Sequence, residues 1–422
     1  MKIFALILFA LTYVLMIAMQ KIRPWVAVAS ALIFIISGIV PVGELLDAID
    51  FNVLMMLAGT MGTVSLFIES KMPNLMAEGL LRKSPNVMWV VVLMSLFAGV
   101  VSAFVDNVAT VLMIAPVGLA IAKKLNISPV GMIISIAVSS NLQGAATLVG
   151  DTTSIMLGGY ADMTFIDFIW MHGKPSIFFA VELGALATVP VIMFLFRRNK
   201  EPITVTEHTE VTNYVPSILL IANVLLLIVA SFVENRPELT NGIICIAIFL
   251  VGLIHSRLSR KDSEVIKQAM KEIDYETLCL LAGLFVVIRG ITNVGLIDDI
   301  SNIIVRLGGD NLFLLYSIIV WVSVLCSAFV DNIPYVATML PVVSAMATTL
   351  GVEPYLLFFG LLTGATLGGN LTPIGASANI AGIGILRKSG YEVKNSDFLK
   401  IGVPFTLCAV LVGYIFCWIF WA

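Results

Sequence analysis

Long apolar runs are the feature that most restricts what this chain can fold into. Runs of 15–22 apolar residues recur along most of its 422 residues, and a helix of that length crosses a bilayer core of about 30 Å. Charged residues make up 12% of the sequence, whereas about 25% is usual in a soluble domain. The sequence therefore predicts an all-α polytopic membrane protein in contact with the lipid bilayer. No basic tail suggests a nucleic-acid partner.

Polar breaks divide the apolar runs into about 10–11 expected spanning helices. Two segments, 87–122 and 311–349, each carry a single charged residue near the middle and are expected to be hairpins. Their length leaves open whether the arms are re-entrant half-spans or paired full spans. The other spans are expected near residues 3–20, 24–42, 52–69, 130–160, 175–196, 214–233, 241–256, 276–294, 354–386 and 402–421.

The basic residues predict the orientation of the chain, because cytoplasmic loops carry the excess of Lys and Arg. With the N-terminus outside, 19 of the 24 Lys and Arg residues fall on the cytoplasmic side, Arg23 among them, and four fall outside. Arg289 lies within a span, where it either reaches the interface or pairs with a carboxylate. We therefore expect a multi-pass protein of the cell (inner) membrane with both termini extracytoplasmic.

The two halves of the chain contain an internal repeat. The sequence Ser-Ala-Phe-Val-Asp-Asn at 102–107 recurs at 327–332, and the same offset of 225 aligns glycines and prolines further along. Residues 102–155 and 327–380 share 18 identities in 54 positions. The charge bias places the two hairpins on opposite sides, so the copies are inverted. Inverted repeats are typical of secondary transporters that bind substrate near the midplane.

Each repeat is expected to hold one hairpin and one broken helix. Gly and Pro interrupt both helices at membrane depth, where free N–H and C=O groups must line a polar cavity inside the protein. The predicted organisation is a first repeat, 1–200, with hairpin 87–122 and broken helix 130–160; a cytoplasmic linker, 201–213; and a second repeat, 214–422, with hairpin 311–349 and broken helix 354–386.

Polar residues at the hairpin tips and helix breaks are the candidate site. A carboxylate at membrane depth is costly and marks a functional position, so Asp106 and Asp331 come first. Asp151 comes next, and its counterpart Ala376 shows that the halves differ chemically. The candidates for substrate or ion binding are Asp106, Asn107, Thr147, Asp151, Thr152, Thr153, Asp331, Asn332, Asn370, Thr372, Ser377 and Asn379, with backbone breaks at Gly144, Gly150, Gly369 and Gly375.

Carbonyl, carboxylate and hydroxyl oxygens at unwound helix segments suit Na⁺. Three carboxylates gathered near the midplane cannot all ionise cheaply, so protons and Na⁺ would compete for the same oxygens. The alternative is that Asp151 only accepts backbone hydrogen bonds from its own loop. The expected Na⁺ ligands are Asp106, Asn107, Gly150, Asp331, Asn332 and Gly375.

The paired motifs at 102–116 and 327–341, followed by the breaks at 144–154 and 369–379, resemble the ion transporter superfamily. Within it they are most similar to the group of arsenite permeases, NhaD-type sodium–proton antiporters and the pigmentation P protein. The resemblance implies re-entrant hairpins with the Asp-Asn pairs at their tips, a mobile transport domain, elevator-type alternating access and a homodimer. Gly150-Asp151 continues into Thr-Thr-Ser, which is closer to the NhaD-type pattern.

We therefore expect an ion-coupled secondary transporter that has no cofactor beyond a coupling Na⁺ or H⁺. No nucleotide-binding, metalloprotease or catalytic-triad motif indicates an enzyme. The substrate stays open between an exported arsenite-like oxyanion and Na⁺ exchanged for H⁺, and a soluble ATPase partner is expected only for an arsenite-type protein. An Na⁺-coupled di- or tricarboxylate carrier, or another anion carrier, is the alternative. An ion channel ranks last, and saturation of transport would distinguish a carrier from it.

Overall fold

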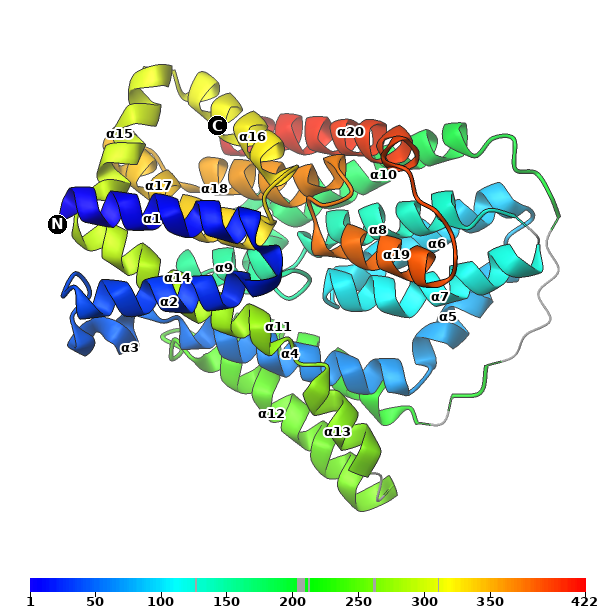
Figure 1. The fold of residues 1–422 in the computed structure, drawn as a ribbon. Helices are drawn as coiled ribbons and strands as arrows, with labels where there is room; N and C mark the ends of the chain where they lie inside the picture. The colour runs from blue at the N-terminus through cyan, green and yellow to red at the C-terminus, as the bar shows by residue number, and fades with distance from the viewer. Residues whose placement is uncertain (126, 203–208, 212, 261–262, 310) are drawn as a thin grey trace.

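Helices make up nearly all the secondary structure in the computed structural model, which describes residues 1–125, 127–202, 209–211, 213–260, 263–309 and 311–422 (Figure 1). The departures from an all-α fold among these residues are a two-stranded antiparallel sheet, β1 (Trp170–Met171) with β2 (Lys174–Pro175), and an isolated β-bridge between Asn86 and Pro202. Within the predicted linker, residues 203–208 and 212 lie outside the described part of the chain.

The helices of the two halves follow one another with short connections. Those before the linker are α1 (Lys2–Ala18), α2 (Arg23–Ile36), α3 (Leu45–Ala48), α4 (Phe51–Glu69), α5 (Met72–Leu81), α6 (Val87–Ser102), α7 (Asn107–Lys124), α8 (Val130–Gly144), α9 (Thr152–Tyr160) and α10 (Ile177–Leu195). Those after it are α11 (Val215–Ala230), α12 (Thr240–His255), α13 (Ser263–Lys271), α14 (Tyr275–Asn293), α15 (Leu296–Gly308), α16 (Leu312–Ser327), α17 (Asn332–Leu350), α18 (Tyr355–Leu362), α19 (Ser377–Lys388) and α20 (Asn395–Trp421).

Among the described residues, seven helices are long and apolar enough to cross a membrane, and nine if each of two bent pairs counts as one span. The chain is therefore a multi-pass membrane protein. The count leaves out four shorter apolar helices, α6, α8, α11 and the segment Tyr355–Leu371, of which the last three belong to predicted spans.

The first two predicted spans are joined by a sharp bend. The α1 segment and residues 20–36 meet at a bend of 113°, where Pro24 occupies the first turn of α2. Proline is tolerated there because the first-turn N–H groups have no partner within the helix. Arg23, which the sequence places on the cytoplasmic side, lies at this bend with its guanidinium against Asp331.

The segments predicted as hairpins are helix pairs joined by four residues. The α6 and α7 helices connect through 103–106, and α16 and α17 connect through 328–331. Figure 1 shows α6 and α7 on the right of the bundle and α16 and α17 on the left. The interrupted helices are α8 with α9, separated by residues 145–151, and α18 with α19, separated by a π-helical turn at Thr363–Leu367 and a short 3₁₀ turn at Gly369–Leu371.

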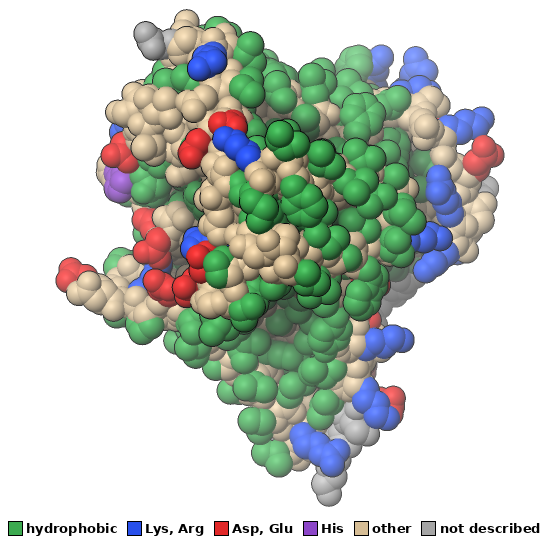
Figure 2. Space-filling model, turned by 60° about the vertical axis from the view of Figure 1, so that its left-hand side comes forward, with side chains coloured by type: hydrophobic (Ala, Val, Ile, Leu, Met, Phe, Trp, Pro, Cys, Tyr) green, Lys and Arg blue, Asp and Glu red, His purple; other side chains and the backbone are tan. Residues whose placement is uncertain are grey.

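Charge is distributed unequally along the bundle. In Figure 2 Lys and Arg side chains gather along the right-hand edge, most Asp and Glu side chains lie at the left, and hydrophobic surface fills the space between. On the described residues, Arg289 pairs with Glu44 at 2.9 Å, which answers the question left open for that arginine. Hydrogen bonds from Asn293 and Arg289 lower the pKa of Glu44, which lies outside the spans.

Candidate functional site

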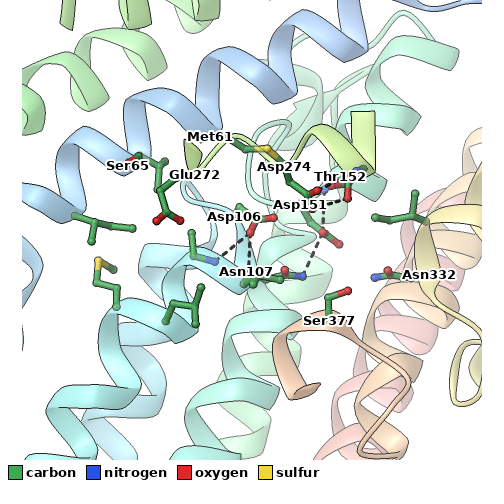
Figure 3. Close-up of a pocket in the computed structure, with 18 of the residues that line it drawn as sticks. Met61, Ser65, Asp106, Asn107, Asp151, Thr152, Glu272, Asp274, Asn332 and Ser377 are labelled. Carbon is green, nitrogen blue, oxygen red and sulfur yellow. Dashed lines mark hydrogen bonds between the residues drawn. The ribbon is translucent and has the colours of Figure 1, made fainter. Parts of the chain in front are cut away.

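A cavity of about 310 Å³ lies between the first hairpin, the first helix break and the N-terminal end of α14 (Figure 3). We call it the acidic cavity, because five carboxylates and one guanidinium line it: Glu69, Asp106, Asp151, Glu272, Asp274 and Arg23. Six of the predicted ligands also line it, namely Asp106, Asn107, Asp151, Thr152, Asn332 and Ser377.

Asp106 is held at the start of α7 by the turn that the hairpin tip makes. Its Oδ2 accepts hydrogen bonds from the backbone N–H groups of Val108 at 3.0 Å and Ala109 at 3.1 Å. An aspartate in this position satisfies N–H groups that the helix leaves free, and the helix dipole favours its negative charge. The tip sequence therefore both begins the helix and presents a carboxylate to the acidic cavity.

Asp151 is held in the same way at the start of α9. Its Oδ1 accepts from the N–H of Thr152 at 2.8 Å and from the amide of Asn107 at 3.3 Å, while the Thr153 hydroxyl donates to Oδ2 at 2.8 Å. The Asn107 amide also donates to Asn141 at 3.1 Å. These bonds join the hairpin tip to the helix break, and they answer only part of the question about Asp151, because it both accepts local hydrogen bonds and lines the cavity.

Backbone carbonyls converge on the glycine of each break. A Cβ atom on Gly150 would lie 2.5 Å from the carbonyl oxygen of Gly144 and 2.7 Å from that of Ala103. A Cβ on Gly375 would lie 2.5 Å from the carbonyl oxygen of Gly369. Only glycine permits so close an approach, and the result is a group of carbonyl oxygens beside each hairpin tip.

Asp331 does not join the other two carboxylates in the acidic cavity. Its Oδ2 lies 2.6 Å from Nη1 of Arg23 and accepts a hydrogen bond from the Ser377 hydroxyl at 3.2 Å. Asp331 therefore lies beside the acidic cavity, with its partners Arg23 and Ser377 in the cavity lining. The sequence did not predict this ion pair, because Arg23 and Asp331 lie 308 residues apart in the chain.

The other predicted side chains act on the backbone around the cavity. The Thr147 hydroxyl donates to the carbonyl of Ala103, and the Thr372 hydroxyl donates to that of Ala328. The Asn370 amide donates to the carbonyl of Val138 at 2.8 Å. The Asn379 amide donates to the carbonyls of Gly369 and Thr372. Five predicted side chains thus lie outside the acidic cavity: Thr147, Thr153, Asn370, Thr372 and Asn379.

The structure adds residues that no motif indicated. Asp274 begins α14, where its Oδ1 accepts from the N–H of Thr277 at 2.9 Å, and it faces the acidic cavity. Glu69, Gln268 and Glu272 line the same side. The signal available for Asp274 was its alignment with Asp50 at an offset of 224, which marks a repeated helix start but says nothing of a cavity. No group of three His, Cys, Asp or Glu able to hold a metal ion occurs among the described residues.

Comparison with known proteins agrees with this architecture. Two uncharacterized transporters, of Mycobacterium bovis and Mycobacterium tuberculosis, are each 29% identical over 99% of this chain and 98% of their own length. The human P protein is 26% identical over 88% of this chain and 53% of its own length. The resemblance to the group that contains the P protein is thus confirmed.

Solved structures show a similar fold. The YdaH transporter of Alcanivorax borkumensis has a TM-score of 0.60 at 15% identity, over 90% of this chain and 86% of that one. MtrF of Neisseria gonorrhoeae, described as an antimetabolite efflux pump, has a TM-score of 0.56 at 16% identity, over 89% of this chain and 82% of that one. Residues 13–364 match the family described as citrate transporter. The chain belongs to the citrate transporter family, within the ion transporter superfamily, and is a secondary membrane transporter.

Proposed function

We propose that this secondary transporter exchanges Na⁺ for H⁺ at Asp106 and Asp151. The observation that carries the proposal is that both carboxylates line the acidic cavity, where the Asn107 amide donates to Asp151 and backbone carbonyl oxygens surround Gly150. Oxygen atoms at unwound helix segments are the usual ligands of Na⁺ in transporters, and a carboxylate can hold a proton in place of the cation.

The buried oxygen of Ser102 supports a cation at this place. Its hydroxyl Oγ has no hydrogen-bond partner among the described residues, although the side chain is fully buried. A buried polar atom without a partner is costly, and a bound cation would use it as a ligand. The carbonyl oxygen of Ser102 lies 2.7 Å from the position of a Cβ on Gly150, in the same group of oxygens.

The charge of the acidic cavity also favours a cation. Its one guanidinium, that of Arg23, already pairs with Asp331, whereas Asp106, Asp151 and Asp274 have no basic partner among the described residues. A free organic trianion would meet only like charge there. Citrate, which the family's description names, would fit this cavity only together with a cation, and that complex is our second candidate.

Export of a neutral hydroxylated solute such as arsenous acid agrees less well, because it gives no role to the paired carboxylates. We further propose re-entrant hairpins, elevator-type alternating access in a homodimer, and the cell membrane with both termini outside. The unequal distribution of Lys and Arg in Figure 2 supports this orientation.

The test is a flux assay with the full-length protein in proteoliposomes that contain a pH-sensitive dye. An inward Na⁺ gradient should drive proton efflux that saturates with Na⁺. The Asp106→Asn and Asp151→Asn variants should lose this flux. The matched control is Glu182→Gln, which removes a carboxylate from α10 that does not line the acidic cavity and should leave the flux unchanged. Flux that neither saturates nor responds to a Na⁺ gradient would contradict exchange, and flux only with citrate plus a divalent cation would favour the second candidate.

A further inference from the structure

The two hairpin tips share hydrogen bonds at positions 225 residues apart. Asp106 and Asp331 each begin a helix and accept a hydrogen bond from the N–H two residues later, at 3.0 Å and 3.1 Å. Thr147 and Thr372 donate to equivalent carbonyls of the two hairpin tips. The two places are therefore comparable atom by atom, and a difference in what their oxygen atoms contact is informative.

In the second half, protein groups already contact these oxygen atoms. Arg23 lies 2.6 Å from Asp331. The Asn379 amide donates to the carbonyl oxygens of Gly369 at 3.2 Å and Thr372 at 3.3 Å. The Ser327 hydroxyl donates to another backbone carbonyl at 2.5 Å. A guanidinium thus supplies positive charge, and an amide supplies N–H donors, where a cation would otherwise bind.

In the first half, the equivalent contacts are missing from the described structure. Asp106 has no basic partner there, and Asp151 adds a second carboxylate where the other half has Ala376. Ser102 and Ser154 are the counterparts of Ser327 and Asn379, and both hydroxyls are buried without a hydrogen-bond partner, as are the Oδ1 atoms of Asn370 and Asn379 in the second half. The difference between the two halves therefore lies in charge: Asp106 and Asp151 have no basic partner among the described residues, whereas Asp331 is balanced by Arg23.

Arg23 is brought to this place by the bend between α1 and α2. The Tyr13 hydroxyl on α1 donates to the Pro334 carbonyl on α17 at 2.7 Å, which ties the bent pair to the second hairpin. Arg23 itself begins α2, where the helix dipole disfavours a positive charge. Asp331 is the group that compensates it, and the side chains of the pair are only 24% and 11% exposed.

We propose that the guanidinium of Arg23 is a built-in counter-ion of Asp331 and occupies the position in the second half where a cation would otherwise bind. Exchangeable Na⁺ therefore binds only in the first half, at Asp106 and Asp151. This inference rests on the proposed function for the first half alone. It narrows the expected set of Na⁺ ligands, which also included Asp331, Asn332 and Gly375, to those of the first half. Its consequence is one coupling cation per chain.

Titration calorimetry of the purified full-length protein with Na⁺ gives the number of cations bound. Wild type should bind one Na⁺ per chain. Arg23→Gln should bind two, because Asp331 loses its counter-ion, and the double variant Arg23→Gln/Asp331→Asn should return to one. The matched control is Arg289→Gln, which breaks a different ion pair, with Glu44, and should still bind one.

An Arg23→Gln variant that unfolds at the wild-type temperature yet binds a single Na⁺ would overturn the inference, and so would a wild type that binds two. If wild type binds none but Arg23→Gln gains one that the double variant lacks, the proposed function fails and the counter-ion role stands. If Arg23→Gln does not fold, recovery of folding in the double variant supports the counter-ion role, and failure of both variants to fold contradicts it.

Discussion

Asn141 and Thr366 stand 225 residues apart, at equivalent positions of the two halves, and the Asn141 amide donates a hydrogen bond to the Thr366 carbonyl at 2.7 Å. A residue that contacts its own counterpart is expected beside the axis that relates two copies. The Thr366 hydroxyl also lies 2.9 Å from that of Thr153, beside Asp151. The π-helical turn of the second half therefore supports the carboxylate of the first.

We predict that Thr366→Val lowers stability by about 1–2 kcal/mol, because it removes one of the two hydrogen bonds of the buried Thr153 hydroxyl. Thr153→Val should cost more, because it also removes the bond to Asp151, and the double variant should cost about 1 kcal/mol less than the sum, since both changes remove the bond between the two threonines. Thermal unfolding in detergent measures all three. Thr349→Val, at an exposed site on α17, is the control and should change stability by less than about 0.5 kcal/mol. Strict additivity would show that the two threonines do not interact.

We predict that Gly150→Ala destabilises the protein by about 3 kcal/mol, because the added Cβ would lie 2.5 Å from the Gly144 carbonyl oxygen and backbone must move. Gly384→Ala is the matched control. A Cβ at Gly384, within α19, meets no atom inside 4 Å, so alanine should stabilise the helix by up to about 1 kcal/mol. Equal unfolding temperatures for the two variants would show that the carbonyl oxygens around Gly150 can move apart to admit a Cβ atom.

The sequence predicts the elements that carry this site but only part of what surrounds them. Asp106 and Asp151 could be found because an aspartate inside an apolar run is costly and rare, and because glycine at 144 and 150 recurs in register. Both are local signals. They identify the helix starts and the breaks. Asp106 and Asp151 are two of the five carboxylates that line the acidic cavity.

Long-range contacts are the part that local signals miss. Arg23 looked like one more basic loop residue, because the pattern of charges along a chain does not show a bend of 113° between two apolar helices. Asp274 looked like a helix start and no more, although it also faces the acidic cavity. No periodicity or spacing in the sequence indicates either contact, since each contact depends on how helices far apart in the sequence pack together.

We predict that cysteines introduced at Lys200 and Asn235 are labelled from opposite sides of the membrane. Both positions are exposed and flank α11, which runs between them as one apolar helix of 16 residues. The basic residues near Lys200 predict that it lies in the cytoplasm. A background without Cys279, the exposed native cysteine, keeps the labelling specific. Labelling of both positions by the same impermeant reagent from outside would contradict the orientation and the inverted repeat.

The last prediction concerns competition between Na⁺ and protons in the acidic cavity. Asp106 and Asp151 are linked through Asn107, so a cation bound between them would release a proton from the pair, and a falling pH would weaken Na⁺ binding. If one Na⁺ displaces one proton, the apparent affinity should fall by up to about tenfold per pH unit in the range where the pair titrates.

Calorimetric measurement of the Na⁺ affinity between about pH 5.5 and pH 8.5 tests this competition. Two interacting carboxylates that are poorly solvated are expected to exchange protons within that range. Asp151→Asn should bind Na⁺ more weakly and with a flatter dependence on pH, since a single carboxylate remains. Glu182→Gln should keep the wild-type slope, because that carboxylate lies outside the acidic cavity. An affinity that is constant across the range in wild type would mean that Na⁺ and protons do not share these oxygen atoms, and coupling would then have to arise elsewhere in the transport cycle.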